Sequence, residues 1–245
     1  MNKKFNILLV GDTCIDEYQY GTVNRISPEA PVPIFNYSHT EIKLGMASNV
    51  KENLSALGCQ VQFYTGKQSK KIRIIDSRTN QHLVRIDHDT ISKPLKISKI
   101  KQINDYDCVI ISDYNKGTVD EQLITDIRQE YNGTIFLDTK KNDLSKFQNI
   151  YIKINEQEYR NSISQNNHLI VTLGKHGAMY NNKVFPTTSS VDVIDVTGAG
   201  DTFLSALAYQ FLYTNNIEHA IEFANRASSI TVQHLGVYAP TLDEI

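Results

Sequence analysis

The strongest constraint on the fold is a set of short apolar runs that each end near a polar residue. Continuous apolar runs of this length are typical of strands buried on both faces of a parallel sheet. Ligands of such sheets bind at the carboxyl ends of the strands, so we expect these polar residues to border a site. Each of them alone would also suit a helix cap or a turn. The runs are residues 5–10, 108–111, 134–137 and 151–154, and the polar residues are Asp12, Asp113, Asp138 and Asn155.

Helical patterns alternate with these strands. Ala47, Val50, Leu54 and Leu57 recur at helical spacing, and Gly58 follows as a stop. The alternation predicts an α/β fold with a mostly parallel central sheet and helices on both faces. The pattern predicts strands at 5–10, 32–37, 61–64, 71–75, 83–86, 108–111, 134–137, 151–154, 169–173 and 178–180, and helices at 47–57, 119–131, 200–213 and 217–234.

Composition narrows the class of protein. The 245 residues are 40% hydrophobic, which is enough to bury a sizeable core. With 25 basic and 27 acidic residues the net charge is −2, so there is no bulk electrostatic reason to bind nucleic acid or an anionic membrane. The apolar run near the N-terminus is shorter than that of a signal peptide, and no segment has the length of a membrane helix. We therefore expect a cytoplasmic enzyme that acts on a small molecule.

Cysteine and histidine usage argues against a structural metal. Cys14, Cys59 and Cys108 are far apart, odd in number and lack a C-x-x-C pair. We interpret them as reduced, buried thiols. His82 and His88 share a polar stretch, but a spaced pair of this kind is more often a surface or core feature than a ligand set.

A glycine-rich loop at residues 195–201, with the sequence DVTGAGD, precedes an apolar helical run. Gly198, Ala199 and Gly200 can expose backbone N–H groups at the helix N-terminus, where these groups and the helix dipole favour an anion. Asp201 would lie at the mouth of this site, where a carboxylate can accept the proton of an attacking hydroxyl during phosphoryl transfer. The alternative is a plain glycine-rich turn with a capping aspartate. The chain has neither the P-loop motif nor the dinucleotide-binding fingerprint.

Four segments of the chain resemble the signatures of the ribokinase-like (PfkB) carbohydrate kinases. Residues 195–201 resemble the DTGAGD signature of that family, and residues 155–158 (NEQE) resemble its N-x-x-E motif. Residues 45–49 (GMASN) resemble a second glycine-rich signature, with Met46 in place of a glycine, and residues 11–16 resemble the N-terminal sugar-binding segment. The order of these segments covers nearly the whole chain. The resemblance implies a ribokinase-like fold and a kinase that uses ATP and Mg²⁺.

Three further segments narrow the resemblance. Residues 24–33 (NRISPEAPVP), 80–87 (NQHLVRID) and 112–117 (SDYNKG) resemble segments of bacterial heptose 7-phosphate kinases, which form one half of a bifunctional ADP-heptose synthesis enzyme. This resemblance implies phosphorylation of the anomeric hydroxyl of D-glycero-D-manno-heptose 7-phosphate to the 1,7-bisphosphate. Two alternatives are a kinase of the same fold for another sugar or sugar phosphate, and a shortened homologue that binds sugar phosphate or nucleotide without turnover.

The family pattern also implies roles for residues on the nucleotide side. By position, Asp201 is the general base, and Gly198, Ala199 and Gly200 form the anion hole. Asn155 and Glu158 would organise Mg²⁺ and the ATP phosphates through water, because Mg²⁺ keeps much of its hydration shell. Positions that flank the nucleotide in the family correspond to Thr172, Gly174, Gly177 and Asn225, and a loop for a monovalent cation such as K⁺ corresponds to Asp195 and Thr197.

On the sugar side, the resemblance assigns hydrogen bonds with sugar hydroxyls to Asp12, Asp16 and Asn49. The phosphate that the substrate already carries needs a cation. Candidates in the heptose-kinase-like segments are Arg25, Arg85 and Lys116. Arginine suits a bidentate grip on phosphate. The alternative for each is an ordinary solvated charge.

The chain is shorter than the family pattern. Only four residues separate Gly66 from Lys71, and the crossover from Asn155 to Leu169 is brief, so one or two βα units are missing. We expect a single ribokinase-like domain over residues 1–245, with no nucleotidyltransferase domain after it. Strands at about 16–40 and 71–88 would form a small lid. Exposed lid edges could pair across a two-fold axis into a homodimer, and a monomer also fits.

Overall fold

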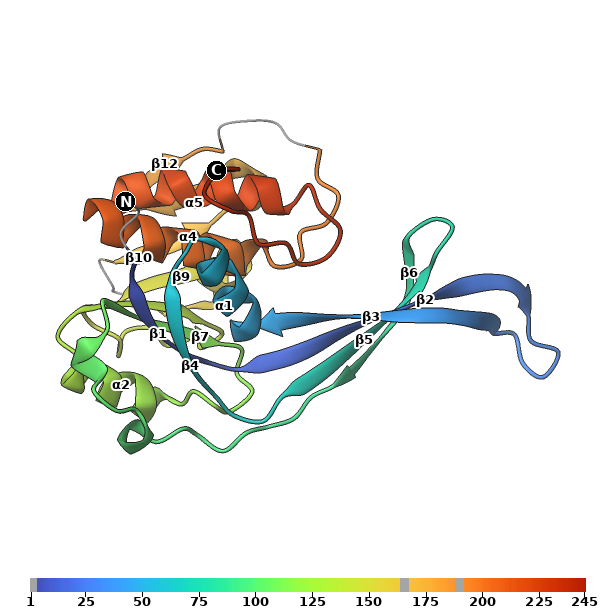
Figure 1. Ribbon diagram of the computed structural model, residues 1–245, viewed down its shortest axis with the longest axis horizontal. Helices are drawn as coiled ribbons and strands as arrows, with labels where there is room; N and C mark the ends of the chain where they lie inside the picture. The colour runs from blue at the N-terminus through green and yellow to red at the C-terminus, as the bar shows by residue number, and fades with distance from the viewer. Residues whose placement is uncertain (1–3, 164–167, 188–191) are drawn as a thin grey trace.

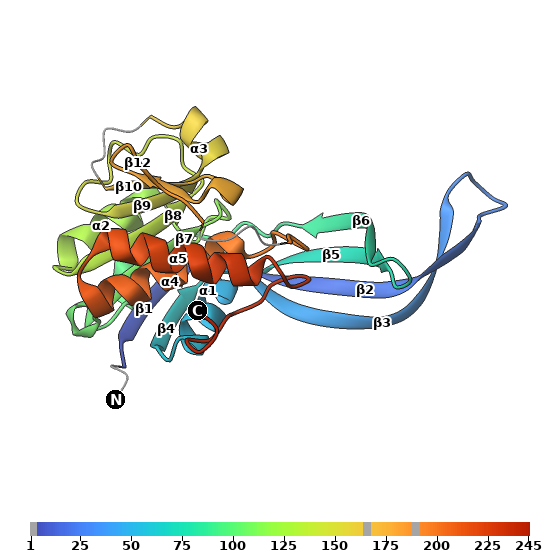
Figure 2. The ribbon, with the colours of Figure 1, turned by 90° about the horizontal axis from the view of Figure 1, so that it is seen from above.

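The computed structural model describes residues 4–163, 168–187 and 192–245. A central sheet carries helices on both faces, and a second, narrow sheet projects from it (Figures 1 and 2). The helices are α1 (Ala47–Ala56), α2 (Glu121–Glu130), α3 (Glu156–Asn161), α4 (Ala199–Thr214) and α5 (Ile217–Thr231). Short 3₁₀ turns occupy Ile97–Lys99, Ile103–Asp105 and Gly174–His176.

The central sheet has eight strands in the order β12-β11-β10-β9-β8-β7-β1-β4. The six strands from β10 to β4 run parallel, and β11 and β12 are antiparallel additions at one edge. The prediction of a mostly parallel sheet is therefore confirmed. The strands are β1 (Asn6–Gly11), β4 (Gln60–Thr65), β7 (Cys108–Asp113), β8 (Thr134–Thr139), β9 (Tyr151–Asn155), β10 (Leu169–Thr172), β11 (Ala178–Tyr180) and β12 (Lys183–Phe185).

Two hydrophobic cores lie on opposite faces of this sheet, which explains why its strands are apolar throughout. In β1, Ile7 and Leu9 face α1, α4 and α5, whereas Leu8 and Val10 face α2. All four side chains are fully buried. A strand covered on both faces has no solvent-facing position, so the alternation of apolar and polar residues disappears.

The second sheet has four strands in the order β3-β2-β5-β6. The predicted hairpin of 71–75 and 83–86 is present as the antiparallel pair β5 and β6. The other two strands, at 14 residues each, are much longer than expected, and their hairpin extends far from the body (Figure 1). Below, this sheet is called the arm sheet. Its strands are β2 (Thr13–Ile26), β3 (Pro33–Met46), β5 (Ser69–Asp76) and β6 (Gln81–His88).

The expected shortening after Gly66 is visible in the connection between the two sheets. Strand β4 ends at Thr65 and β5 begins at Ser69, so no helix lies between them. In the second shortened region α3 has only six residues, and part of the following connection lies outside the described residues. The three cysteines are buried and free, as predicted. Within the described ranges, no helix is long and apolar enough to cross a membrane.

Candidate active site

The polar residues that end neighbouring strands lie at one edge of the central sheet. Asp12 follows β1, Asp113 ends β7, Asp138 lies near the end of β8 and Asn155 ends β9. These four strands are adjacent and parallel in the sheet. Asp12, Asp113 and Asp138 are nearly fully buried. The sequence pattern therefore predicted which side chains share one edge of the sheet, and ligands of such folds bind at this edge.

The glycine-rich loop meets this edge and begins α4. Gly198 is the N-cap of α4 and has a φ of 81°, a left-handed conformation that glycine adopts at little cost. A Cβ added to Gly198 would lie only 2.7 Å from Asn49 Nδ2, so a side chain would also displace Asn49. At the preceding glycine-rich segment, Met46 holds a φ of 57°, a conformation in which the glycine it replaces would be unstrained.

Asp201 lies in the first turn of α4 and is 4% exposed. Its Oδ2 accepts a hydrogen bond from Asn49 Nδ2 at 2.9 Å, and its Oδ1 accepts one from the Tyr114 hydroxyl at 2.7 Å. Burial raises the pKa of Asp201 to about 6, and the bonds from Asn49 and Tyr114 oppose that rise. A carboxyl with a pKa near 6 is ionised at neutral pH and still basic enough to accept a proton.

A buried ion pair lies beside the same helix terminus. Lys153 Nζ is 2.8 Å from Asp138 Oδ2, and both side chains are nearly inaccessible to solvent. A Cβ added to Gly200 would lie 2.9 Å from Lys153 Nζ, so the ammonium borders the first turn of α4. The ammonium and the helix N-terminus together favour an anion at this point. Sequence reasoning missed Lys153, although a lysine inside an apolar strand is a signal in itself.

A cavity of about 810 Å³ opens next to the glycine-rich loop. It is within the size range of small-molecule and cofactor sites. All four residues predicted to flank a nucleotide line it, together with two residues of the predicted anion hole: Thr172, Gly174, Gly177, Asn225, Ala199 and Gly200. Apolar side chains of Val193, Val196, Phe203 and Val232 line the same space. The cavity therefore combines an apolar surface, suited to a flat ring, with backbone groups suited to phosphates.

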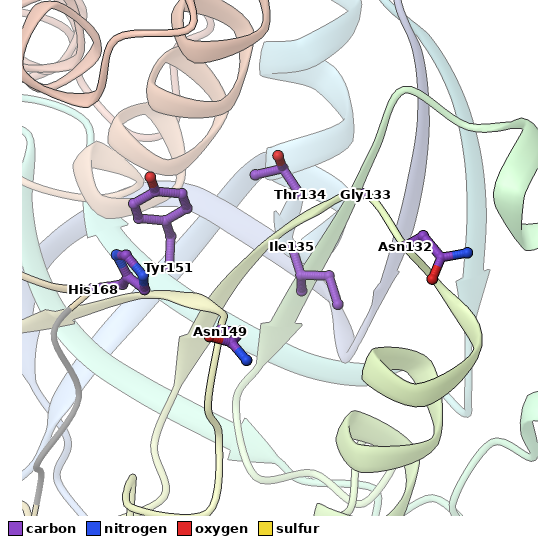
Figure 3. A pocket seen from close by; sticks show the side chains of 7 residues that line it. All are labelled: Asn132, Gly133, Thr134, Ile135, Asn149, Tyr151 and His168. Atoms are coloured by element: carbon purple, nitrogen blue, oxygen red, sulfur yellow. The ribbon is translucent and has the colours of Figure 1, made fainter.

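A second cavity lies at the opposite end of the strands. Its volume is about 250 Å³, and its lining includes Thr134 and Tyr151, the first residues of β8 and β9 (Figure 3). His168 lies beside Tyr151 in this view, and Asn149 lies farther along the lining. Because the cavity is at the amino ends of the strands, it is separated from Asp201 by the length of the sheet.

Asn155 and Glu158 form a capping box at the start of α3. Asn155 Oδ1 accepts from the Glu158 N–H, and Glu158 Oε2 accepts from the Asn155 N–H, both at 2.8 Å. Glu158 also forms an ion pair with Lys140. On the next strand, the buried Asp138 Oδ1 has no hydrogen-bond partner among the described residues. Carboxylate oxygens in these positions fit Mg²⁺ held partly through water. The described residues contain no group of three or more histidine, cysteine and acidic side chains with metal-binding geometry.

The two aspartates predicted to bind sugar hydroxyls already form hydrogen bonds or an ion pair within the protein. The Asp12 carboxylate accepts backbone N–H bonds from Tyr114, Lys116 and Thr118, at 2.9 to 3.0 Å. Asp16 forms a buried ion pair with Arg73. Its three backbone bonds mean that Asp12 organises the 114–118 loop. A carboxylate offers about four acceptor sites, so Asp12 and Asp16 each keep capacity for a further hydrogen bond.

The three cations predicted to hold the substrate's phosphate lie in different places. Lys116 belongs to the loop that Asp12 organises, and its Nζ pairs with Asp89 at 2.6 Å. Arg85 lies on β6 directly opposite Arg73 and pairs with Asp87. The prediction for Arg25 does not fit a substrate bound in the same chain. Arg25 lies at the exposed far end of β2, nine residues beyond Asp16, a distance of about 30 Å along an extended strand.

The predicted monovalent-cation residues stabilise their own loop. Asp195 Oδ1 accepts from the Thr197 N–H at 2.9 Å and from the Thr197 hydroxyl at 2.7 Å. Asp195 Oδ2 accepts from the Gly236 N–H at 2.8 Å. Partial burial would raise the pKa of Asp195, but these hydrogen bonds outweigh it and lower the pKa. Asp195 therefore stays ionised and ties the 235–237 segment to the glycine-rich loop.

The fold and the site define a class of protein. The chain superposes on the ribokinase of Thermotoga maritima with a TM-score of 0.73 at 18% identity, covering 98% of this chain and 97% of that one. It superposes on an Arabidopsis thaliana ribokinase, solved in complex with ribose and ATP, with a TM-score of 0.72 at 13% identity, covering 99% and 97%. The predicted ribokinase-like α/β fold is therefore confirmed.

The sequence comparison gives the family. Residues 142–244 match the model described as "pfkB family carbohydrate kinase". These residues therefore carry a PfkB carbohydrate kinase domain, as the sequence predicted. The chain is also 33% identical to the "Bifunctional protein HldE" of a Nitratiruptor species over 301 aligned positions, with 99% of this chain covered. The chain spans 64% of the length of that relative. The alignment is longer than the chain, which means that the relative contains segments missing here.

Proposed function

We propose that this protein transfers the γ-phosphoryl group of ATP to the anomeric hydroxyl of D-glycero-D-manno-heptose 7-phosphate. Asp201 accepts the hydroxyl proton, the sugar oxygen forms a bond to the γ-phosphorus, and the bond from that phosphorus to the bridging oxygen breaks to release ADP. The observation that carries the proposal is the position of Asp201, a buried carboxylate with a pKa near 6 in the first turn of α4. We place the reaction in the cytoplasm, where the sequence analysis expects the chain.

The nucleotide side of the proposal rests on the 810 Å³ cavity. ATP binds there with its base against the apolar side chains and its phosphates toward Ala199 and Gly200. Lys153 and the N-terminus of α4 then stabilise the charge that develops on the transferred group. Asn155, Glu158 and the unpaired oxygen of Asp138 hold Mg²⁺ through water, and the ion neutralises phosphate charge. We also propose a monovalent cation beside Asp195 and Thr197.

The choice of heptose 7-phosphate rests on sequence similarity rather than on geometry. Relatives that are 32% and 33% identical to the chain carry the name HldE. The three heptose-kinase-like segments lie at the turn between β2 and β3, on β6, and at the end of β7 with the loop that follows it. Asp12, Asp16 and Asn49 would face the sugar, with Lys116 and Arg85 nearest to its phosphate. Arg25 is omitted from this proposal because it lies at the far end of the arm sheet.

A substrate panel tests this choice. ADP release is measured with ATP and Mg²⁺ in the presence of heptose 7-phosphate, ribose, fructose and fructose phosphates. Turnover with heptose 7-phosphate in clear excess over the others supports the proposal. Turnover with another sugar and none with heptose 7-phosphate assigns the protein to a different substrate. Saturable binding of the ligands without ADP formation identifies it as a binding protein.

We also propose that two copies pair through the arm sheet. Alternate residues of its strands place apolar side chains on one face, because Ile15 lies opposite Leu44, Ile72 opposite Ile86, and Ile74 opposite Val84. The same face carries the Glu17–Lys70 ion pair. Ile42 belongs to the same face and is 64% exposed. Exposed apolar patches of this kind mark interaction sites, and two sheet faces pack well against each other. A second copy offers the matching surface.

Substitution of Ile42 by glutamate is expected to dissociate this dimer, because the new carboxylate would be buried directly opposite Glu17, whose charge Lys70 already neutralises, and would have no cation of its own. The measurement is molar mass by light scattering at micromolar concentration. Val184→Glu is the matched control, since Val184 is similarly exposed on β12 of the central sheet. The dimer proposal is wrong if the unmodified chain has the mass of a monomer, or if both variants behave alike.

A further inference from the structure

Asp201, the candidate general base, accepts a hydrogen bond from a tyrosine hydroxyl to which the sequence motifs assigned no role. The Tyr114 hydroxyl donates to Asp201 Oδ1 at 2.7 Å, across 87 residues of chain. Asn49 occupies the other oxygen, Oδ2. Each carboxylate oxygen accepts about two hydrogen bonds, so one site on each oxygen is still open to a substrate hydroxyl. Tyr114 can therefore remain bonded to Asp201 while the carboxylate receives a proton.

The position of Tyr114 is fixed by its own loop. The Asp12 carboxylate accepts the Tyr114 N–H at 3.0 Å and the N–H groups of Lys116 and Thr118. Lys140 Nζ lies 5.3 Å from the centre of the Tyr114 ring, within the range of a cation–π contact. The backbone hydrogen bond to Asp12 and the contact of Lys140 with the ring face therefore fix the Tyr114 side chain, and its hydroxyl donates to Asp201 Oδ1.

The phenol keeps its proton at this position. Burial, followed by the nearby Asp201 carboxylate, raises the pKa of Tyr114 well above its ordinary value. Tyr114 therefore keeps its proton at neutral and mildly alkaline pH and donates it in the hydrogen bond to Asp201. A hydrogen bond donated to a carboxylate stabilises the ionised form and disfavours protonation.

We propose that Tyr114 is a positioning residue for the general base, and that its hydroxyl keeps the Asp201 carboxylate ionised and oriented toward the sugar hydroxyl. Substrate contact is not needed for this role. The titratable or polar groups that influence Asp201 come from several elements: Tyr114 after β7, Asn49 on α1, Asp138 on β8, Lys153 on β9, Lys140 after β8 and Cys14 on β2. Of these, only Tyr114 and Asn49 are hydrogen-bonded to the carboxylate.

The first test does not depend on turnover. The Asp201 carboxyl is titrated by carbon-13 NMR in the full chain, with its resonance assigned by its loss in Asp201→Asn. We expect a midpoint near pH 6 in the unmodified protein and a midpoint about one to two pH units higher in Tyr114→Phe. Equal midpoints in the two proteins overturn the proposal. This experiment gives its answer even if no sugar is phosphorylated.

The second test is kinetic and rests on the proposed function. Because Asp201 must be ionised to act, the acid limb of kcat/KM is expected to move to higher pH in Tyr114→Phe. Near pH 5 the kcat/KM of the variant should be about 10- to 100-fold lower, because a rise of about one to two units in the Asp201 pKa lowers the ionised fraction by that factor. Near pH 9 the carboxylate is ionised in both proteins, so kcat/KM should lie within about threefold of the unmodified enzyme. A uniform loss at every pH indicates a structural role and contradicts the proposal.

Tyr131→Phe is the matched control for both tests. Tyr114 is half-buried and Tyr131 is buried, and the Tyr131 hydroxyl likewise donates one hydrogen bond, of 2.9 Å, to the Tyr106 carbonyl. Tyr131 follows α2, on the face of the sheet opposite to α4. The same loss of one hydroxyl is expected to leave both the Asp201 midpoint and the pH profile unchanged.

Discussion

Replacing Asp201 with asparagine is expected to lower kcat about 10²- to 10⁴-fold, the range typical of losing a general base. An amide cannot accept the proton of the attacking hydroxyl, while its size keeps the contact with Asn49 possible. The measurement is ADP release in the presence of ATP, Mg²⁺ and the sugar phosphate. Binding of both ligands, followed by calorimetry, should change little, because the loss is in the chemical step.

Urea unfolding of Asp201→Asn shows whether a loss of activity comes from the chemical step or from loss of the fold. A carboxyl whose pKa is higher in the folded than in the unfolded chain lowers the stability of the fold as pH rises above the unfolded pKa, and the full penalty is present above the folded pKa, because the ionised carboxylate is less favourable in the folded chain than in water. Burial raises the pKa of Asp201 to about 6, so at pH 8 the asparagine variant should unfold at an equal or higher urea concentration.

Asp120→Asn is the control for the loss of a carboxylate near a helix N-terminus. Asp120 caps α2, and asparagine caps helices equally well. Full activity in Asp120→Asn, together with more than a tenth of normal activity in Asp201→Asn, would show that Asp201 is not the base.

Much of the fold followed from the sequence because the central strands are buried on both faces. Continuous apolar runs such as those around Leu8 and Ile110 have no other common explanation at that length. The glycine-rich loop could also be predicted, because the left-handed backbone conformation at the start of α4 favours glycine, and Gly198 is visible in the sequence. These features depend on residues that are neighbours in the chain.

The arm sheet was harder to predict because its two faces differ from those of the central sheet. One face carries partly exposed apolar side chains around the Glu17–Lys70 ion pair, and the other carries polar and charged residues such as Asp16 and Arg73. Strands β2 and β3 therefore contain many polar residues along their length, and only part of each suggested a strand. The role predicted for Arg25 does not fit a substrate bound in the same chain for a related reason, since it depended on where the far end of β2 lies.

The partners of Asp201 could not be read from the sequence. Asn49 is 152 residues away in the chain and Tyr114 is 87 residues away. Their contact depends on how α1, the 114–118 loop and α4 pack at one edge of the sheet. Sequence motifs identified Asn49 and Asp201 separately, and only the folded chain joins them.

Lys153→Met is expected to have the largest effect on stability. It leaves the Asp138 carboxylate buried without its cation, and Asp138 Oδ1 already lacks a hydrogen-bond partner among the described residues. Removing one member of a buried ion pair costs about 3–5 kcal/mol, which equilibrium urea denaturation can measure. Activity should also fall about 10²- to 10³-fold, because the ammonium beside Gly200 no longer stabilises charge on the transferred phosphoryl group.

The double variant Lys153→Met, Asp138→Asn distinguishes the two effects. Removing the uncompensated carboxylate should recover most of the lost stability, since no buried charge remains at that pair. The activity should stay low, because the positive charge near the N-terminus of α4 is still absent and the Asp138 oxygen proposed for Mg²⁺ is lost as well. A double variant that regains both stability and activity would show that Lys153 only neutralises Asp138. A single variant as stable as the unmodified chain would show that water or another residue compensates Asp138 in solution.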